Sequence, residues 1–365
     1  MTVLLSRRQL IGCGAALAVL PWIGSAASQP STGIKVLQQL KTGNRLLSPF
    51  TLQGNALYLN GDSTVEAWDK DKAQMLWQRP LENHAGFRPR LSEDVLITSG
   101  RHHLAAWDKE NGTDRWRYAP NDELAVPLVH NNRIHFGDRH SIITLDASSG
   151  EKIWSFDTIA SARIAYAPIG VGNKILIGPG DGCLYALSAD KGELLWKVDR
   201  EADWQYLRQL GIHNDLLIAG GYHDELFGIN MQDGSIVWRF YAGNFINSQL
   251  VTDGKVCFWS PTGWIYALDA NTGSVLWRHQ TIDYKNRGRA QNWSPVMAEL
   301  VAQDNLLYIL AMDHILHVLD LNTGDERASL ELPERVRPFV SIDEHNPQRL
   351  FLGSNDGHIL QLELT

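Results

Sequence analysis

The sequence has 365 residues, of which 44% are hydrophobic and 20% are charged, and this balance excludes a disordered chain. Its formal net charge of -8 at pH 7 argues against a nucleic-acid-binding surface, which needs net basic character or a basic stripe. We therefore expect a globular protein with no nucleic-acid partner.

The first 27 residues differ in composition from the rest of the chain. Arg7 and Arg8 precede an apolar stretch from Leu10 to Leu20, and small residues gather at positions 24–27. This pattern predicts a twin-arginine signal peptide over residues 1–27, and hence a periplasmic or secreted protein. The alternative is an ordinary Sec signal that contains two arginines. The apolar stretch is too short to span a membrane, and Cys13 lies too close to Arg8 for a lipoprotein signal, so we expect no membrane span or lipid anchor in the mature chain.

One pattern returns about every 40 residues from Leu57 to the C-terminus. It consists of a short apolar run, a polar turn that usually ends in glycine, and a second apolar run with a tryptophan four residues past the glycine. The last apolar residue before the turn marks each unit: Trp68, Trp107, Leu145, Leu187, Ile229, Leu268, Leu319 and Leu362. By subtraction, the marks are 39, 38, 42, 42, 39, 51 and 43 residues apart.

Within a unit every apolar run has the length and composition of a β-strand. In the unit of Leu268 we expect strands over Asn247 to Thr252, Lys255 to Ser260, Trp264 to Asp269, and Ser274 to His279, separated by turn residues. Both faces of these strands are apolar, as expected for a sheet covered on both sides. Residues 34–365 are therefore predicted to form an all-β fold, a single eight-bladed β-propeller of four-stranded antiparallel blades.

The two ends of the repeat predict how the ring closes. The last unit stops after its third strand, and Ile34 to Leu40 is a strand without a unit of its own. We expect this N-terminal strand to complete the last blade and so remove an exposed sheet edge.

The turn glycines and the tryptophans have structural explanations. Asp269 to Gly273 suits a type I turn followed by a left-handed residue, which glycine adopts at little cost. Six tryptophans at one position of the repeat are expected to pack between blades, each with its N–H on a backbone carbonyl of the next blade. They are Trp77, Trp116, Trp154, Trp196, Trp238 and Trp277. Two units depart from the pattern, with Ala73 at the glycine position and Ala328 at the tryptophan position.

The segments Ala267 to Trp277 and Ala105 to Trp116 are the best matches to the pattern A-x-D-x-x-T-G-x-x-x-W and closely resemble the pyrroloquinoline-quinone (PQQ)-like repeat. The resemblance covers residues 34–365 and implies the eight-bladed fold. Its members include quinoprotein alcohol dehydrogenases and the BamB-type scaffold of the outer-membrane barrel assembly machine, which binds no quinone. The predicted single propeller, without an added cytochrome, is similar to the BamB type. The N-terminus departs from that family, whose members are lipid-anchored. The resemblance implies a scaffold or assembly factor without catalytic activity or cofactor, which binds a periplasmic or outer-membrane protein.

The alternative is a PQQ-binding oxidoreductase with calcium, or an accessory quinoprotein. The twin-arginine route exports folded proteins, often with a redox group already inserted, so the predicted signal peptide favours this alternative. The enzymes' disulfide between adjacent cysteines cannot form here, because no two cysteines are neighbours. Cys183 and Cys257 fall in different units, so we expect buried free thiols.

A set of arginines is the first candidate binding site. They lie at or just before the prolines that begin the innermost strands, at Arg45, Arg88, Arg163, Arg208, Arg289 and Arg337. If six blades direct a guanidinium to one mouth of the channel, they would suit a carboxylate-bearing ligand or an acidic peptide. The alternative is that each arginine pairs with a local acid or faces solvent.

An insertion of roughly ten residues explains the spacing of 51 and is the second candidate site. It lies within Thr281 to Trp293 and is basic and aromatic, with Tyr284, Lys285, Arg287, Arg289, Asn292 and Trp293. Such a loop is a candidate for contact with a partner. The alternative is that it caps the channel.

The histidines predict no metal site. Four of them occupy the second turn of separate blades, at His102, His140, His223 and His314, too far apart around a ring to share one ion. We expect them in left-handed turn positions, where histidine is tolerated. Only His102 and His103 beside His140 form a plausible pair.

Overall fold

The structure is a computed structural model, and it describes residues 33–81, 87–100, 102–158, 164, 166–199, 208–220, 225–242, 249–260, 263–281, 299–311, 315–332, 336–337 and 339–365. Of Arg208 and Gln209 only the backbone is described. The predicted signal peptide over residues 1–27 lies outside this part of the chain. Across the described ranges, no helix is long and apolar enough to cross a membrane.

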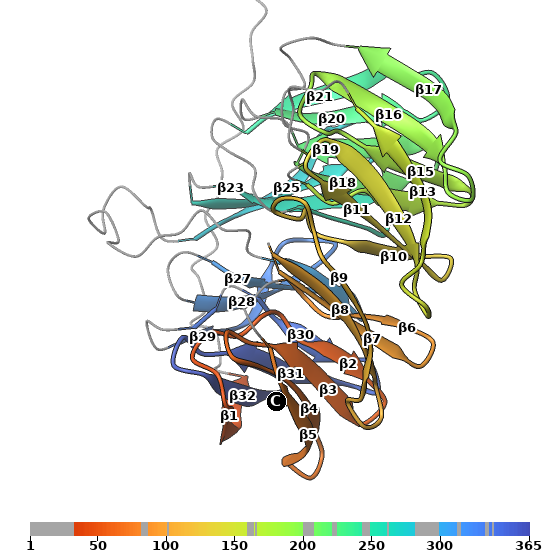
Figure 1. Cartoon of the computed structure of the whole chain (residues 1–365). Helices are drawn as coiled ribbons and strands as arrows, with labels where there is room; N and C mark the ends of the chain where they lie inside the picture. The colour runs from red at the N-terminus through yellow and green to blue at the C-terminus, as the bar shows by residue number, and fades with distance from the viewer. Residues whose placement is uncertain are drawn as a thin grey trace, which may run out of the picture.

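The described residues form eight four-stranded antiparallel sheets, the blades of a β-propeller, as predicted (Figure 1). Blades 1 to 4 consist of β2 (Thr51–Gln53), β3 (Ala56–Asn60), β4 (Thr64–Asp69) and β5 (Gln74–Pro80); β6 (Arg90–Ser92), β7 (Val95–Gly100), β8 (His103–Asp108) and β9 (Asp114–Tyr118); β10 (Leu128–His130), β11 (Arg133–Asp138), β12 (Ser141–Asp146) and β13 (Lys152–Asp157); and β14 (Ile169–Val171), β15 (Lys174–Ile177), β16 (Cys183–Ser188) and β17 (Leu194–Asp199).

Blades 5 to 7 continue in the same order, and blade 8 takes its fourth strand from the N-terminal end of the described chain. These blades consist of β18 (Arg208–His213), β19 (Leu216–Gly220), β20 (Glu225–Asn230) and β21 (Ile236–Tyr241); β22 (Gln249–Thr252), β23 (Lys255–Ser260), β24 (Trp264–Asp269) and β25 (Val275–Gln280); β26 (Val301–Gln303), β27 (Leu306–Leu310), β28 (Ile315–Asp320) and β29 (Glu326–Glu331); and β30 (Ser341–Asp343), β31 (Asn346–Gly353), β32 (His358–Leu364) and β1 (Ile34–Lys41). The strands predicted in blade 6 are confirmed to within two residues at each end.

The hydrophobic core lies between the blades. The buried apolar residues of the described ranges fall into eight clusters, and each cluster joins two neighbouring blades. Between blades 5 and 6, for example, Ile218 and Trp238 pack with Val256, Phe258 and Leu268. The middle strands of each sheet are therefore covered on both faces, which explains why they lack polar alternation, whereas an outer strand such as β25 keeps exposed positions.

The repeated tryptophans join consecutive blades, as predicted. The Nε1 atoms of five of them donate to a carbonyl oxygen of the next blade at 3.0–3.1 Å: Trp77 to Lys109, Trp116 to Ala147, Trp154 to Ala189, Trp238 to Ala270, and Trp277 to Leu321. Trp196 is the exception, because its buried Nε1 has no hydrogen-bond partner among the described residues.

The turn glycine has a second role that the sequence did not indicate. Gly273 has the expected positive φ of 69°, but the Trp238 ring also lies against it, and a Cβ at this position would come within 2.5 Å of that ring. Ala73 occupies the same turn position in blade 1 with φ 56°. The preceding outer strand there is β1, which contains no tryptophan. Alanine is tolerated because no indole needs the space of its methyl group.

Ring closure takes place between blades 8 and 1. Strand β1 pairs antiparallel with β32, from Ile34 opposite Leu364 to Lys41 opposite His358 (Figure 1), which confirms the predicted closure. A buried ion pair joins the two blades, with Lys70 Nζ of blade 1 at 2.6 Å from Asp343 Oδ2 of blade 8. Main-chain pairing within blade 8 and the ion pair between blades 8 and 1 thus hold the ends of the repeat together. Strand β1, the outer strand of blade 8, has no tryptophan to do so.

Two smaller expectations have opposite outcomes. Cys183 and Cys257 are buried free cysteines in blades 4 and 6, as predicted. The left-handed position expected for His140 was wrong, because the residue with positive φ in that two-residue loop is Arg139, at 61°. A type II′ turn requires positive φ only at its first central residue.

Candidate functional site

A cavity of about 550 Å³ lies between the inner strands of several blades. Strand β2 of blade 1, β6 of blade 2, β26 of blade 7 and β30 of blade 8 supply most of its wall, and Val129 of blade 3 adds to it. We call this cavity the axial pocket. Its polar side chains include Arg88, Arg90, Ser341 and Glu344 among apolar residues such as Phe50.

The Arg88 guanidinium ties three blades together at the axial pocket. Its Nη1 donates to the carbonyl oxygen of Phe50 and to Ser341 Oγ, the latter at 3.3 Å. Its Nη2 forms an ion pair with Glu299 Oε2. Ser341 Oγ also donates to the Phe50 carbonyl, at 3.1 Å. The arginine of blade 2 therefore contacts blades 1 and 8 and the segment that leads into blade 7.

Arg90 brings a second positive charge to the pocket, at the start of β6 and two residues after Arg88. Its Nε is buried and has no hydrogen-bond partner within the described ranges. Burial, and next the positive charge of Arg88, lower the pKa of the Arg90 guanidinium, while the Glu299 carboxylate acts in the opposite direction. Glu299 and Glu344 balance the two guanidiniums in formal charge, so the feature that favours a further anionic group here is the unpaired Arg90 Nε.

This arrangement can bind carboxylates. A planar guanidinium holds a carboxylate through two parallel hydrogen bonds. The Glu299 side chain is 35% exposed, so an incoming carboxylate could compete with it for Arg88. The same guanidiniums would suit the carboxylates of pyrroloquinoline quinone, whereas a calcium ion would have to draw on Glu299 or Glu344.

Of the predicted arginines whose side chains the structure describes, only Arg88 lines the axial pocket. Arg45 is exposed, and its backbone N–H donates to Asp62 Oδ1 at 2.8 Å. Arg337 is half-buried, and burial lowers the pKa of its guanidinium. Arg163 and the side chain of Arg208 lie outside the described residues, as do Tyr284, Lys285, Arg287, Arg289, Asn292 and Trp293. Their roles in binding stay predictions.

Arg90 and Glu299 were missed by the sequence reasoning. Arg90 follows Arg88 and Pro89 directly, and the alternation of side chains along a strand could have flagged it. Glu299 is 211 residues from its partner Arg88, so no local spacing could reveal their contact. It is the first described residue after the predicted insertion.

The comparisons with known proteins agree with the propeller fold. A family profile described as "Outer membrane protein assembly factor BamB" matches residues 61–197 and 180–346. The chain is 23% identical over 222 residues to the outer membrane protein assembly factor BamB of Moranella endobia, across 56% of this chain and 57% of that protein. It is 30% identical over 160 residues to the quinohemoprotein alcohol dehydrogenase ADH IIB of Pseudomonas putida, across 36% of this chain and 23% of that enzyme.

Among solved structures, BamB from Moraxella catarrhalis superposes with a TM-score of 0.68 at 17% sequence identity, over 90% of this chain and 97% of that one. This likeness shows a shared propeller fold. The sequence alignment spans little more than half the length of the Moranella endobia relative. The family profile, in contrast, covers most of the ring, from blade 1 to blade 8. This chain therefore belongs to the family described as outer membrane protein assembly factor BamB.

Proposed function

We propose that this protein is an exported periplasmic scaffold that assists the assembly of outer-membrane proteins and has no catalytic activity of its own. The observation that carries the proposal is the BamB family profile, which matches from residue 61 to residue 346. That range takes in blades 2 to 7 and parts of blades 1 and 8. The proposal thus rests on most of the ring rather than on one motif.

The axial pocket supports a role in protein binding. Its two guanidiniums offer bidentate sites for carboxylates, and Glu344 on its wall is exposed to solvent. An acidic segment of a partner could therefore pair with Arg88 and Arg90. The partner in this proposal is a periplasmic or outer-membrane protein.

Export by the twin-arginine route is part of the same proposal. Arg7 and Arg8 precede the apolar stretch expected of such a signal. The Arg7→Lys, Arg8→Lys double variant should stay in the cytoplasm, as measured by cell fractionation. Normal export of this variant would contradict the assignment.

Deletion of the gene in the parent cell tests the assembly function. The deletion should lower the amount of folded outer-membrane β-barrel protein, and the wild-type chain should restore it. Arg88→Met should restore it less well, although it should accumulate to the same level. Unchanged β-barrel levels after deletion, in a strain where the protein is normally made, would contradict the proposal.

The alternative is a quinone-binding protein, either a dehydrogenase or an accessory factor, and the axial pocket is the observation that favours it. A pocket of about 550 Å³ with two guanidiniums could hold a quinone that bears carboxylates. The absorbance spectrum and intact mass of the purified exported protein distinguish the two functions. One quinone per chain would contradict the scaffold, and no binding after quinone and calcium are supplied would contradict the alternative.

A further inference from the structure

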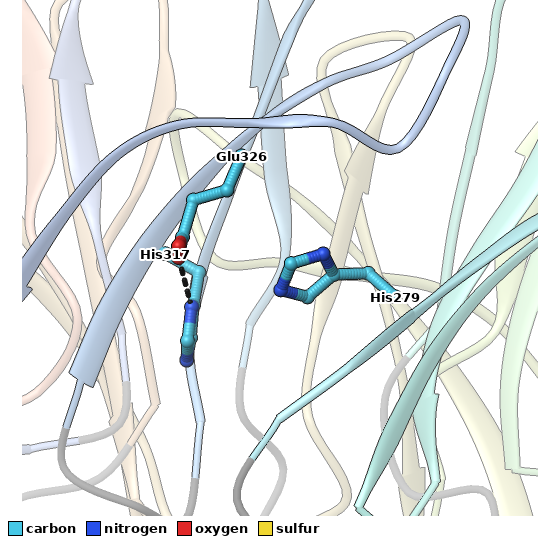
Figure 2. Close-up of side chains that lie close together, drawn as sticks. All are labelled: His279, His317 and Glu326. Atoms are coloured by element: carbon cyan, nitrogen blue, oxygen red, sulfur yellow. Dashed lines mark hydrogen bonds and ion pairs between the residues drawn. The ribbon is translucent and has the colours of Figure 1, made fainter. Parts of the chain in front are cut away.

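Two histidines and a glutamate meet between blades 6 and 7. They are His279 on β25, His317 on β28 and Glu326 on β29, and a donor atom from each lies within 4.8 Å of the other two (Figure 2). His317 is only 5% exposed. Its Nδ1 lies 2.6 Å from Glu326 Oε1.

Strand register explains why these side chains face one another. His279 lies two residues after Trp277, so both project from the same face of β25, and Trp277 is hydrogen-bonded to Leu321 of blade 7. On blade 7, His317 lies two residues before Leu319, which pairs with Glu326. Leu319 packs in the core cluster between blades 6 and 7. All three donors therefore project into one blade interface.

The same two positions carry aromatic rings at other interfaces. Phe156 and Tyr185 meet between blades 3 and 4 at 5.8 Å, and Phe240 and Tyr266 between blades 5 and 6 at 5.7 Å, both edge to face. His279 and His317 keep this geometry at 5.7 Å, so the backbone is unchanged and only the chemistry differs.

Glu326 supplies the carboxylate at this interface. It pairs with Leu319 across β28 and β29. The corresponding position of blade 6 is occupied by Val275, which pairs with Leu268. A carboxylate and two imidazoles thus coincide at one interface, where the equivalent residues between blades 5 and 6 are Phe240, Tyr266 and Val275.

We propose that His279, His317 and Glu326 bind a divalent transition-metal ion, with Zn²⁺ as the best fit. Two imidazole nitrogens and a carboxylate oxygen form a ligand set typical of zinc, and water would take the fourth position. At zinc–ligand distances of about 2.0–2.2 Å, tetrahedral donors lie roughly 3.3 Å apart, so modest side-chain rotations from the present spacing suffice. Coordination through His317 Nδ1 would replace its contact with Glu326 Oε1 and release a proton from that contact to solvent.

The ion would link blade 6 to blade 7 close to the insertion. His279 lies two residues before Thr281, where the described part of blade 6 ends, and the chain is described again from Glu299. The segment that connects the two blades in sequence lies outside the described residues. A metal ion bound by His279 of blade 6 and by His317 and Glu326 of blade 7 would link the two blades directly.

Zinc titration of the full exported chain, without a histidine tag, tests the proposal. After dialysis against a chelator, calorimetry should show one Zn²⁺ bound per chain, and Zn²⁺ should raise the melting temperature. Cobalt substitution should give the visible absorption of a tetrahedral site. Glu326→Gln removes one of the three protein ligands and should weaken zinc binding by more than roughly 100-fold, the upper end of what loss of an outer-shell partner costs.

The repeat supplies a variant that should fold normally. His279→Phe with His317→Tyr installs the aromatic pair found between blades 5 and 6, so its melting temperature in chelator should match or exceed that of wild type while its response to Zn²⁺ is lost. His358→Gln is the matched control, because His358 also pairs with a carboxylate, at 3.0 Å from Asp356, but lies outside the cluster. A zinc response that persists in the double variant, or is absent from wild type, would overturn the proposal.

Discussion

The blade interfaces and the axial pocket are built from different kinds of residue. The interfaces consist of positions that return with every repeat, such as Trp238 and Trp277, each hydrogen-bonded to the following blade. The axial pocket depends on contacts between blades that are not neighbours, such as the ion pair of Arg88 with Glu299. We infer that the interfaces between neighbouring blades supply most of the stability and that partner binding lies at the inner strands around the axis.

The largest effect is expected at a tryptophan of the interfaces. Trp277→Ala removes a buried indole and its hydrogen bond to Leu321, and should lower the free energy of unfolding by about 3–5 kcal/mol. Trp238→Ala should cost about the same, because it occupies the equivalent position one blade earlier. Denaturant unfolding followed by fluorescence measures both; losses below about 1 kcal/mol would mean that the tryptophans do not hold the blades together.

The ring-closing interface should be nearly as sensitive to loss of one charge. Lys70→Met leaves the Asp343 carboxylate buried without its partner, which should cost about 3 kcal/mol. Replacing both residues, as Lys70→Met with Asp343→Leu, should recover most of the loss. If the single and double variants were equally unstable in denaturant, the unpaired Asp343 carboxylate would not explain the stability lost in Lys70→Met.

The turn glycines sharpen the comparison between blades. Gly273→Ala forces a left-handed alanine against the Trp238 ring, and should cost at least about 1–2 kcal/mol. Ala73→Gly is the matched change in blade 1, where no indole covers the turn, and should alter stability by less than about 1 kcal/mol. Equal effects of the two changes on the melting temperature would contradict the packing role of Gly273.

A turn carboxylate should make stability depend on acid. The Arg327 guanidinium, together with the backbone N–H groups of Asn322 and Thr323, lowers the pKa of Asp320 to about 2. Since an aspartate in the unfolded chain titrates near 3.9, its stabilising contribution is complete above about pH 4 and is lost as the pH falls towards 2. Asp320→Asn should therefore lose less stability than wild type over this range. If the melting temperatures of wild type and Asp320→Asn fell in parallel as the pH was lowered, Asp320 would be excluded as a source of the acid dependence.

The smallest effect on stability is expected in the axial pocket. Arg88→Met removes an ion pair whose carboxylate is partly exposed, so the free energy of unfolding should change by less than about 1 kcal/mol. The same variant should nevertheless impair outer-membrane assembly in the cell. A variant that unfolds as easily as Trp277→Ala would place the pocket among the structural interfaces.

The sequence predicted the fold well because every interface uses the same residues in the same order. Trp277 and Gly273 could be read from the repeat, and so could the closing strand, because the last unit lacks one strand. The contact of Arg88 with Glu299 could not be predicted, since it joins residues that only the closed ring brings together. His279 and His317 belong to different units, but aligning the repeats position by position would have set them against Phe240 and Tyr266.

Site-specific photocrosslinking in the parent cell tests the central claim most directly. A photoreactive residue at Glu344, exposed on the axial pocket, is compared with one at Arg278, exposed on the outer strand of blade 6. We predict that position 344 captures a protein of the outer-membrane assembly machinery and that position 278 does not. Equal capture from both positions, or capture from position 278 alone, would contradict the assignment of binding to the axial pocket.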